Sequence, residues 1–271
     1  MRLPIFVLMI AAISVNGFAQ PATAKDVNHD GVVSLLVPIA FSQAQTLRGA
    51  QGTIWGGEIW YRNGSTQDVV SLQPTGICMP FCGIGFPAGN IDRVWAVNSN
   101  KNNGAMLHVP SAVADSFHVS ARVREYSRNA QPTGVEIPVI SESEFFRGEQ
   151  WFLAVPTGEG VRSAIRVYDP RALPETSVQA DFFSSAGELL DSITLRPGDD
   201  PYVYHIDNNR KPVNVPTIAS VLNLTAAFPS LANHEYVHIR VRPLQDGREY
   251  WGMVSVTHNE TQHVLIITAQ P

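Results

Sequence analysis

A chain of 271 residues is long enough for one large domain or two ordinary ones. It carries 24 acidic and 19 basic residues and a formal net charge of −5. This balance argues against a nucleic-acid-binding protein, because such proteins cluster positive charge. Nineteen prolines and twenty glycines are spread along the chain and punctuate it with loops.

The first nineteen residues predict a signal peptide for export. Arg2 supplies the positive start, residues 3–15 are apolar, and residues 17–19 place small side chains at the cleavage positions. The apolar stretch is shorter than the ~20 residues of a membrane-spanning helix, so we expect no membrane span. We expect cleavage after Ala19 or after Ala24, and neither site is followed by the Cys of a lipid anchor. The protein is therefore predicted to be secreted and to reside outside the cell, in the periplasm or at the cell surface.

A polar N-terminal segment, residues 20–31, leads into the first strand and contains the start of a calcium-loop-like motif. Residues 26–34 (DVNHDGVVS) match the first nine positions of an EF-hand-type calcium loop, with Gly31 at the turn. The candidate ligands are Asp26, Asn28, Asp30 and Ser34. Position 12, where a bidentate acid normally closes the cage, is Val37. Two readings stay open: weak calcium binding that orders the N-terminus, and a polar turn before the strand. Calcium is the cofactor that this segment suggests.

Beyond this segment, almost every periodic stretch alternates apolar and polar residues, as half-buried strands do. In residues 117–124, Phe117, Val119, Ala121 and Val123 share one face. The other predicted strands are 32–40, 53–62, 68–72, 92–97, 164–168, 177–183, 188–195, 202–206 and 215–224. No segment of ten or more residues shows a helical period. We therefore predict an all-β fold class with antiparallel sheets.

Three turn signals predict hairpins: Asn63-Gly64, Ala186-Gly187 and Asp246-Gly247. The number of strands suits two tandem β-sandwich domains of the immunoglobulin-like type. A weak internal repeat supports this, because VPI followed by RGAQ in residues 37–51 is similar to IPV followed by RGEQ in residues 137–150. The polar stretch 127–134 gives the boundary, so we predict one β-sandwich over residues 32–134 and a second over residues 135–271.

Two cysteines, Cys78 and Cys82, lie four residues apart in the segment CMPFC. In an oxidising compartment this spacing favours a disulfide that closes a small loop, with free thiols as the alternative. Two thiolates alone would supply only half the ligands of a metal site.

The closing pattern WGMVSVTHNETQHV, residues 251–264, and the segment TGVEIPV, residues 133–139, resemble a group of uncharacterised secreted proteins from environmental bacteria. The resemblance spans much of the mature chain and implies an export signal followed by β-sandwich modules. It implies no activity and offers no catalytic residues to transfer.

His234-Glu235-Tyr236-Val237-His238 has the letters of the zinc-peptidase motif H-E-x-x-H. In such peptidases the motif lies on a helix, so that both His side chains reach one zinc ion and Glu acts as the general base. Here the alternation in residues 233–242 predicts a strand, which turns and returns as residues 249–257. Two His side chains four residues apart on a strand would lie roughly 13 Å apart, too far for one zinc ion. A helix beginning within residues 229–233, with Glu260 as the third ligand, is the alternative.

Three functions follow from the sequence. The favoured one is a non-catalytic interaction or structural protein whose partner is an unknown extracellular protein or glycan. The first alternative is a glycan- or ligand-binding module stabilised by calcium, which predicts Trp55, Trp60 or Trp251 on a solvent-exposed face. The second alternative is a zinc-dependent hydrolase through His234, Glu235 and His238. We expect no enzyme, because the sequence contains no G-x-S-x-G elbow, no dinucleotide-binding glycine motif and no P-loop.

Overall fold

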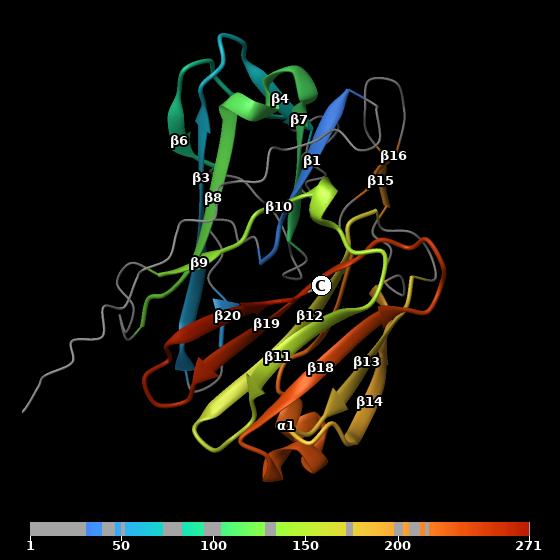
Figure 1. Cartoon of the computed structure of the whole chain (residues 1–271). Helices are drawn as coiled ribbons and strands as arrows, with labels where there is room; N and C mark the ends of the chain where they lie inside the picture. The colour runs from blue at the N-terminus through green and yellow to red at the C-terminus, as the bar shows by residue number, and fades with distance from the viewer. Residues whose placement is uncertain are drawn as a thin grey trace, which may run out of the picture.

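The structure is a computed structural model that describes residues 31–39, 47–49, 52–72, 83–94, 104–127, 134–171, 176–197, 203–205, 212–214 and 217–270. In these ranges the chain forms antiparallel β-sheets with few helical turns, which confirms the all-β prediction (Figure 1). The predicted export signal, the candidate ligands Asp26, Asn28 and Asp30, and both cysteines lie outside the described residues. Within the described part of the chain, no helix has the length and apolar character needed to cross a membrane.

In the described part of the N-terminal half, three antiparallel sheets share one core. Its strands are β1 (Val32–Val37), β2 (Leu47–Arg48), β3 (Ile54–Asn63), β4 (Val69–Leu72), β5 (Gly83–Phe86), β6 (Ile91–Arg93), β7 (Ala105–Pro110), β8 (Phe117–Glu125), β9 (Val135–Ile137) and β10 (Ile140–Ser141). The pairings are β10-β1-β7, β4-β5, and β2-β3-β8-β9 with β6 also on β3. One core cluster collects buried residues from these sheets, and Tyr61, Phe86 and Phe117 pack ring against ring within it. The alternation of residues 117–124 is confirmed, since Phe117, Ala121 and Val123 are buried.

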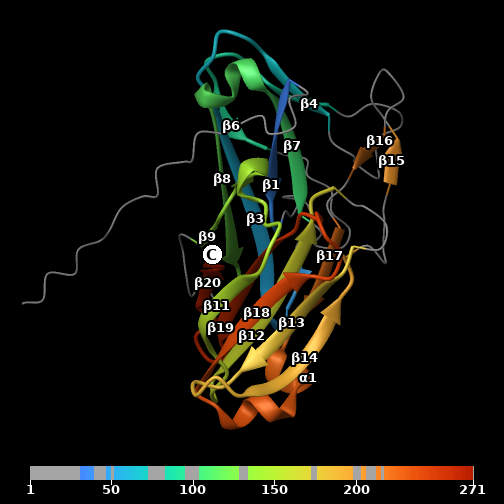
Figure 2. The ribbon, with the colours of Figure 1, turned by 45° about the vertical axis from the view of Figure 1, so that its right-hand side comes forward.

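The C-terminal half places two four-stranded sheets face to face. Its elements are β11 (Gln150–Pro156), β12 (Val161–Asp169), β13 (Val178–Phe183), β14 (Leu189–Leu195), β15 (Val203–His205), β16 (Pro212–Asn214), β17 (Thr217–Val221), α1 (Leu224–Ala227), β18 (Tyr236–Pro243), β19 (Trp251–His258) and β20 (Val264–Thr268). The sheets are β11-β18-β13-β14 and β17-β12-β19-β20, while β15 pairs with β16. Phe152, Phe182 and Ile239 from the first sheet share a core with Ile165 and Val254 from the second. The arrangement is sandwich-like, with the two sheets as its layers (Figures 1 and 2).

A third apolar cluster joins the two halves. Leu36, Met106 and Ile140 come from β1, β7 and β10, and Tyr168, Trp251 and Met253 come from β12 and β19. All six side chains are buried. We call this cluster the junction. Because it removes apolar surface of both halves from water, it holds them together.

One of the three predicted hairpins is confirmed and two are wrong. Ala186-Gly187 joins the paired strands β13 and β14, and Gly187 adopts a φ of 82°. After Asn63-Gly64, however, the chain leaves the sheet of β3, and β4 pairs with β5. After Asp246-Gly247 the chain crosses between layers, because β18 belongs to one sheet and β19 to the other. Turn chemistry specifies a local reversal but does not choose the neighbouring strand.

Some predicted boundaries also move. The strand predicted over residues 215–224 ends at Val221, and Asn223 caps α1 by accepting a hydrogen bond from the Ala226 N–H. The strand predicted from residue 233 begins at Tyr236. Strands β9 and β10 pair with β8 and β1, so residues 135–141 are attached to the N-terminal sheets. The two-domain division at residue 134 stays a prediction.

Candidate functional site

The H-E-x-x-H letters lie across the end of a short 3₁₀ helix, Pro229–Asn233, and the start of β18. His234 follows the 3₁₀ helix in an extended conformation, and its carbonyl accepts a hydrogen bond from the Thr157 hydroxyl at 2.8 Å. His238 lies on β18, where its Nδ1 accepts a hydrogen bond from the Ala154 N–H at 3.2 Å. The helical context that a zinc-peptidase motif requires is absent from residues 234–238. The strand interpretation is confirmed from Tyr236 onward.

Among the described residues, no three His, Cys, Asp or Glu side chains gather into a metal-binding group. Ser34, the one described candidate for the calcium loop, lies on β1, and its hydroxyl is 3.1 Å from His108 Nδ1. The calcium site and the Cys78–Cys82 disulfide therefore stay predictions.

The tryptophans named as a sugar-stacking platform do not share a solvent face. Trp251 is 3% exposed and belongs to the junction. Trp55 and Trp60 are five residues apart on β3, so they face opposite sides of the sheet. The Arg93 guanidinium lies 4.5 Å from the centre of the Trp60 ring system. This arrangement counts against a platform built from these three residues.

The outer face of the β11-β18-β13-β14 sheet carries a group of side chains that the sequence did not predict to lie together. We call Trp151, Asp181, Phe183, Arg240 and Arg242 the outer-face cluster. Trp151 and Arg240 lie opposite each other on β11 and β18, and Arg240 lies opposite Asp181 on β13. The Trp151 and Phe183 rings are 5.4 Å apart, and the Arg240 guanidinium lies 5.7 Å and 5.1 Å from them. Aromatic rings and a cation thus pack together across three strands.

A buried carboxylate anchors the outer-face cluster. Asp181 is 5% exposed, and its Oδ2 accepts hydrogen bonds from Arg240 Nη2 at 2.7 Å and Nε at 3.2 Å. Arg242 Nε lies 3.7 Å from the same oxygen, and Gln179 Nε2 donates to Oδ1 at 3.2 Å. A buried charge needs such pairing, because an unpaired carboxylate would lose its hydration. Two hydrogen bonds therefore hold Arg240 on the sheet, while Arg242 makes a longer ion pair with the same carboxylate.

Exposed apolar side chains lie beside this cluster. The pairing of β11 with β18 is irregular between Phe152 and Val155, and Ala154 adopts a φ of 51°. A β-bulge of this kind changes the direction of neighbouring side chains. Leu153 is 51% exposed and Tyr236 is 38% exposed, and the Tyr236 ring packs edge-on against His238 at 5.8 Å. We call Leu153 and Tyr236 the rim.

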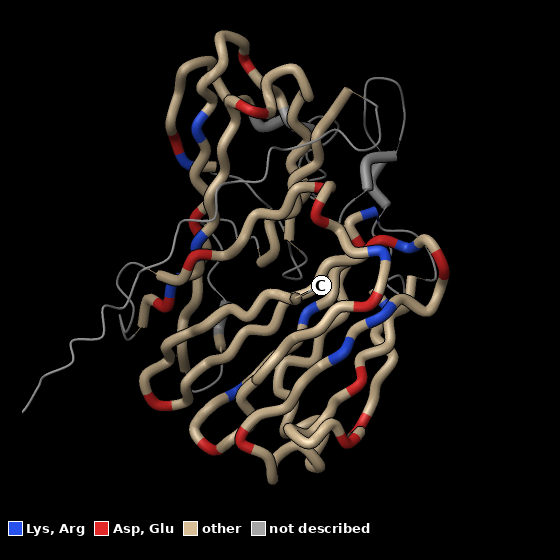
Figure 3. The backbone as a smooth tube through the Cα atoms, viewed as in Figure 1, with Lys and Arg blue, Asp and Glu red and all other residues tan. Residues whose placement is uncertain are grey.

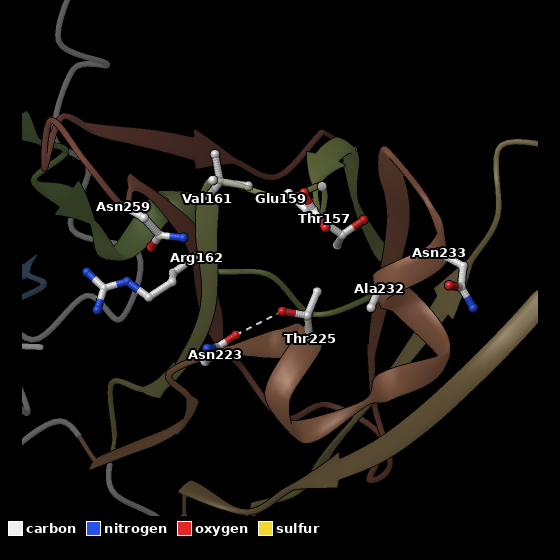
Figure 4. Close-up of a pocket in the computed structure, with 11 residues that line it drawn as sticks. Thr157, Glu159, Val161, Arg162, Asn223, Thr225, Ala232, Asn233 and Asn259 are labelled. Carbon is white, nitrogen blue, oxygen red and sulfur yellow. Dashed lines mark hydrogen bonds between the residues drawn. The ribbon is translucent and has the colours of Figure 1, made fainter.

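A pocket of about 590 Å³ lies at the end of the C-terminal sandwich, beside α1 (Figure 4). Its side chains come from the β11–β12 turn, the start of β12, α1, the end of the 3₁₀ helix and the β19–β20 turn. The lining residues are Thr157, Gly158, Glu159, Gly160, Val161, Arg162, Asn223, Thr225, Ala232, Asn233 and Asn259. We call it the end pocket. It contains hydroxyl and amide groups, one carboxylate and one guanidinium, a set that can bind ligands by hydrogen bonds.

The sequence predicts only part of the outer-face cluster and of the end pocket. Alternation places Arg240 and Arg242 on the polar face of β18, but only the strand order β11-β18-β13 brings them next to Trp151 and Asp181. The end pocket joins turns that are up to a hundred residues apart, such as those of Glu159 and Asn259. Comparison of the chain with models of protein families, with curated proteins and with solved structures finds no match in any of the three.

Proposed function

We propose that this chain is an exported, non-catalytic β-sandwich protein that binds another extracellular protein through the outer-face cluster and its rim. The observation that carries the proposal is the fixed packing of Trp151, Phe183 and Arg240 beside exposed Leu153 and Tyr236. Trp, Tyr and Arg are the residues that dominate the binding energy of protein interfaces.

Two physical properties support this use of the face. Its charged groups are balanced, because Arg240 and Arg242 lie near Asp181 and Glu149. Basic and acidic residues are likewise interspersed over the view in Figure 3. Because two hydrogen bonds to Asp181 already hold the Arg240 side chain, binding would cost little further entropy of that side chain.

The proposal includes two tandem immunoglobulin-like sandwiches after a signal peptide. The pairs β12–β17 and β13–β18 correspond to the B–E and C–F pairs of immunoglobulin domains and support it. Strand β19 departs from that order, since it pairs with β12 instead of β18.

The proposal also includes calcium binding by the loop of Asp26, Asn28, Asp30 and Ser34, and a disulfide between Cys78 and Cys82. Calcium titration and mass spectrometry of the non-reduced mature protein test these two.

The zinc hydrolase is not proposed. Residues 234–238 lack the helix that would bring both His side chains to one metal ion. Purified mature protein that retained one zinc ion per chain would contradict the non-catalytic assignment.

Site-specific cross-linking tests the interaction. A photoreactive amino acid in place of Leu153 is expected to cross-link the producing cell's own partner protein. The same amino acid in place of Val70, which is 59% exposed on β4, is the matched control. Tyr236→Ser is expected to reduce the cross-link from position 153 by about tenfold, as loss of an interface anchor does. Equal products from positions 70 and 153, or no product from 153, would contradict the proposal.

A further inference from the structure

The end pocket is separate from the outer-face cluster, and we propose that it binds a neutral polyhydroxylated ligand, a short saccharide. A volume of about 590 Å³ lies in the range of small-molecule sites, roughly 300 to 1,000 Å³. The end pocket would add a small-molecule site to a protein that we propose to bind another protein elsewhere.

The chemistry of the lining favours hydroxyl groups as ligands. Asn223, Asn233 and Asn259 supply amides, and Thr225 supplies a hydroxyl, whereas the Thr157 hydroxyl donates to the His234 carbonyl. Amides and hydroxyls both donate and accept hydrogen bonds, as sugar hydroxyls do. Val161 and Ala232 add apolar surface that can contact the C–H groups of a sugar ring. Glu159 and Arg162 supply one charge of each sign, so the pocket has no excess charge that would select an ion.

Hydrogen bonds hold the walls of the end pocket in place. The Thr157 N–H donates to the Glu235 carbonyl at 3.0 Å, and the Asn259 N–H donates to the Gly160 carbonyl at 2.7 Å. The first bond attaches the β11–β12 turn to Glu235, which directly precedes β18. The second attaches the same turn to the β19–β20 turn. Thr225 Oγ1 donates to Asn223 Oδ1 at 3.1 Å, as Figure 4 shows. A site fixed before binding loses less entropy when a ligand arrives.

Two polar atoms in the wall have unused hydrogen-bonding capacity. Arg162 Nε and Asn259 Oδ1 are buried and have no hydrogen-bond partner. Such atoms are costly, and their presence in a folded protein calls for a partner. One is a donor and the other an acceptor, and a sugar hydroxyl can satisfy either kind. Both side chains are half-buried, and both residues line the end pocket.

Ligand-observed NMR on the mature protein tests the inference. The probes are neutral mono- to tetrasaccharides of the common hexoses, pentoses and N-acetylhexosamines, each at up to about 10 mM to reach weak affinities. At least one is expected to give saturable binding. Asn259→Ala should weaken that binding about tenfold, the effect of losing one hydrogen bond. Ala232→Trp should abolish it by filling the pocket, since Ala232 is exposed and tolerates a larger side chain.

The control variant is Gln67→Ala, which removes an exposed amide from the N-terminal half and should leave binding unchanged. Melting temperatures of all variants separate loss of binding from loss of fold. Absence of binding by every neutral saccharide, binding that survives Ala232→Trp, or binding of uronic acids alone would overturn the inference. The outcome is independent of cross-linking from position 153, so failure of one proposal is distinguishable from failure of the other.

Discussion

The buried side chain of Tyr168, in the junction, makes the stability of the protein depend on pH. It lies on β12 opposite Trp251 of β19, with 6.0 Å between the ring centres, and is 0% exposed. Burial raises the pKa of the Tyr168 hydroxyl to about 12, because a phenolate would lose its hydration there, and the nearby Arg166 charge only partly opposes this. Burial also raises the pKa of Tyr250.

We predict that stability falls as pH rises from about 10 to about 12, because the unfolded chain loses its tyrosine protons first. The stabilisation from neutral Tyr168 is fully present below pH 10.0, the ordinary pKa, and is lost as pH passes the folded pKa. Its size is about 2 to 3 kcal/mol for a shift of roughly two pH units. Urea unfolding at about pH 9 and about pH 11.5 measures the fall.

Tyr168→Phe removes the titrating group and should make this fall smaller, while Tyr250 continues to contribute in the same direction. Equal falls in the wild type and in Tyr168→Phe would show that Tyr168 does not contribute to the pH dependence.

Hydrogen bonds of particular side chains, and one glycine, determine where the strands end. In the β13–β14 hairpin, Ser184 Oγ accepts hydrogen bonds from the Ala186 and Glu188 N–H groups, at 3.2 Å and 3.1 Å. Gly187 completes the turn with a φ of 82°. Asn63 has another role, because its buried side chain donates to the Gln67 and Phe86 carbonyls, each at 2.8 Å. It thereby fixes the exit of the chain from β3, where the sequence predicts a hairpin.

Gly187→Ala is predicted to destabilise the protein by about 1 to 2 kcal/mol, because a side chain disfavours positive φ. No atom lies within 4 Å of the added Cβ, so steric contact adds nothing. Gly85→Ala on β5 is the matched control, since its Cβ also meets nothing within 4 Å and its φ is not positive. Its effect should stay within about 0.5 kcal/mol. Chemical denaturation measures the free energy of unfolding of both variants. Equal losses of stability would argue against a cost from the positive φ at Gly187.

On the scale of the whole molecule, buried contacts and ion pairs fix how the strands are connected. Tyr250 directly precedes β19 in the β18–β19 crossing, and its hydroxyl shares its one proton between the Gly148 and Val241 carbonyls, at 2.8 Å and 2.9 Å. Glu249, 8% exposed, accepts hydrogen bonds from Arg147 Nε at 2.8 Å and Arg171 Nε at 2.6 Å. The crossing is thus attached to segments that precede β11 and follow β12.

Trp251→Ala is predicted to cost about 3 to 5 kcal/mol, because it opens a cavity in the junction. Since the junction joins the two halves, we expect calorimetry to show one thermal transition in the wild type and two in the variant. Val70→Ala, which changes an exposed side chain, should retain one transition. A variant that unfolds in one transition at a lower temperature would show that the halves are coupled by other contacts.

The sequence by itself determined the all-β class and most of the strands. Side chains alternate along any strand with one dry face, so Phe117, Ala121 and Val123 revealed β8 without knowledge of its neighbours. For the same reason, the alternation of Val237, Ile239 and Val241 predicted that the second half of the H-E-x-x-H motif lies on a strand. Local turn chemistry also sufficed for Gly187.

The order of the strands in each sheet is decided by the tertiary structure. Turn residues specify where the chain reverses, but they do not specify which strand the next segment pairs with. The tertiary fold alone decided that β18 and β19 lie in different sheets and that Trp251 fills the junction. It also brought Asp181 beneath Arg240 and placed Glu159 near Asn259 in the end pocket. Periodicity shows which face of a strand is polar, but the side chains that meet across that face are set by packing between distant segments.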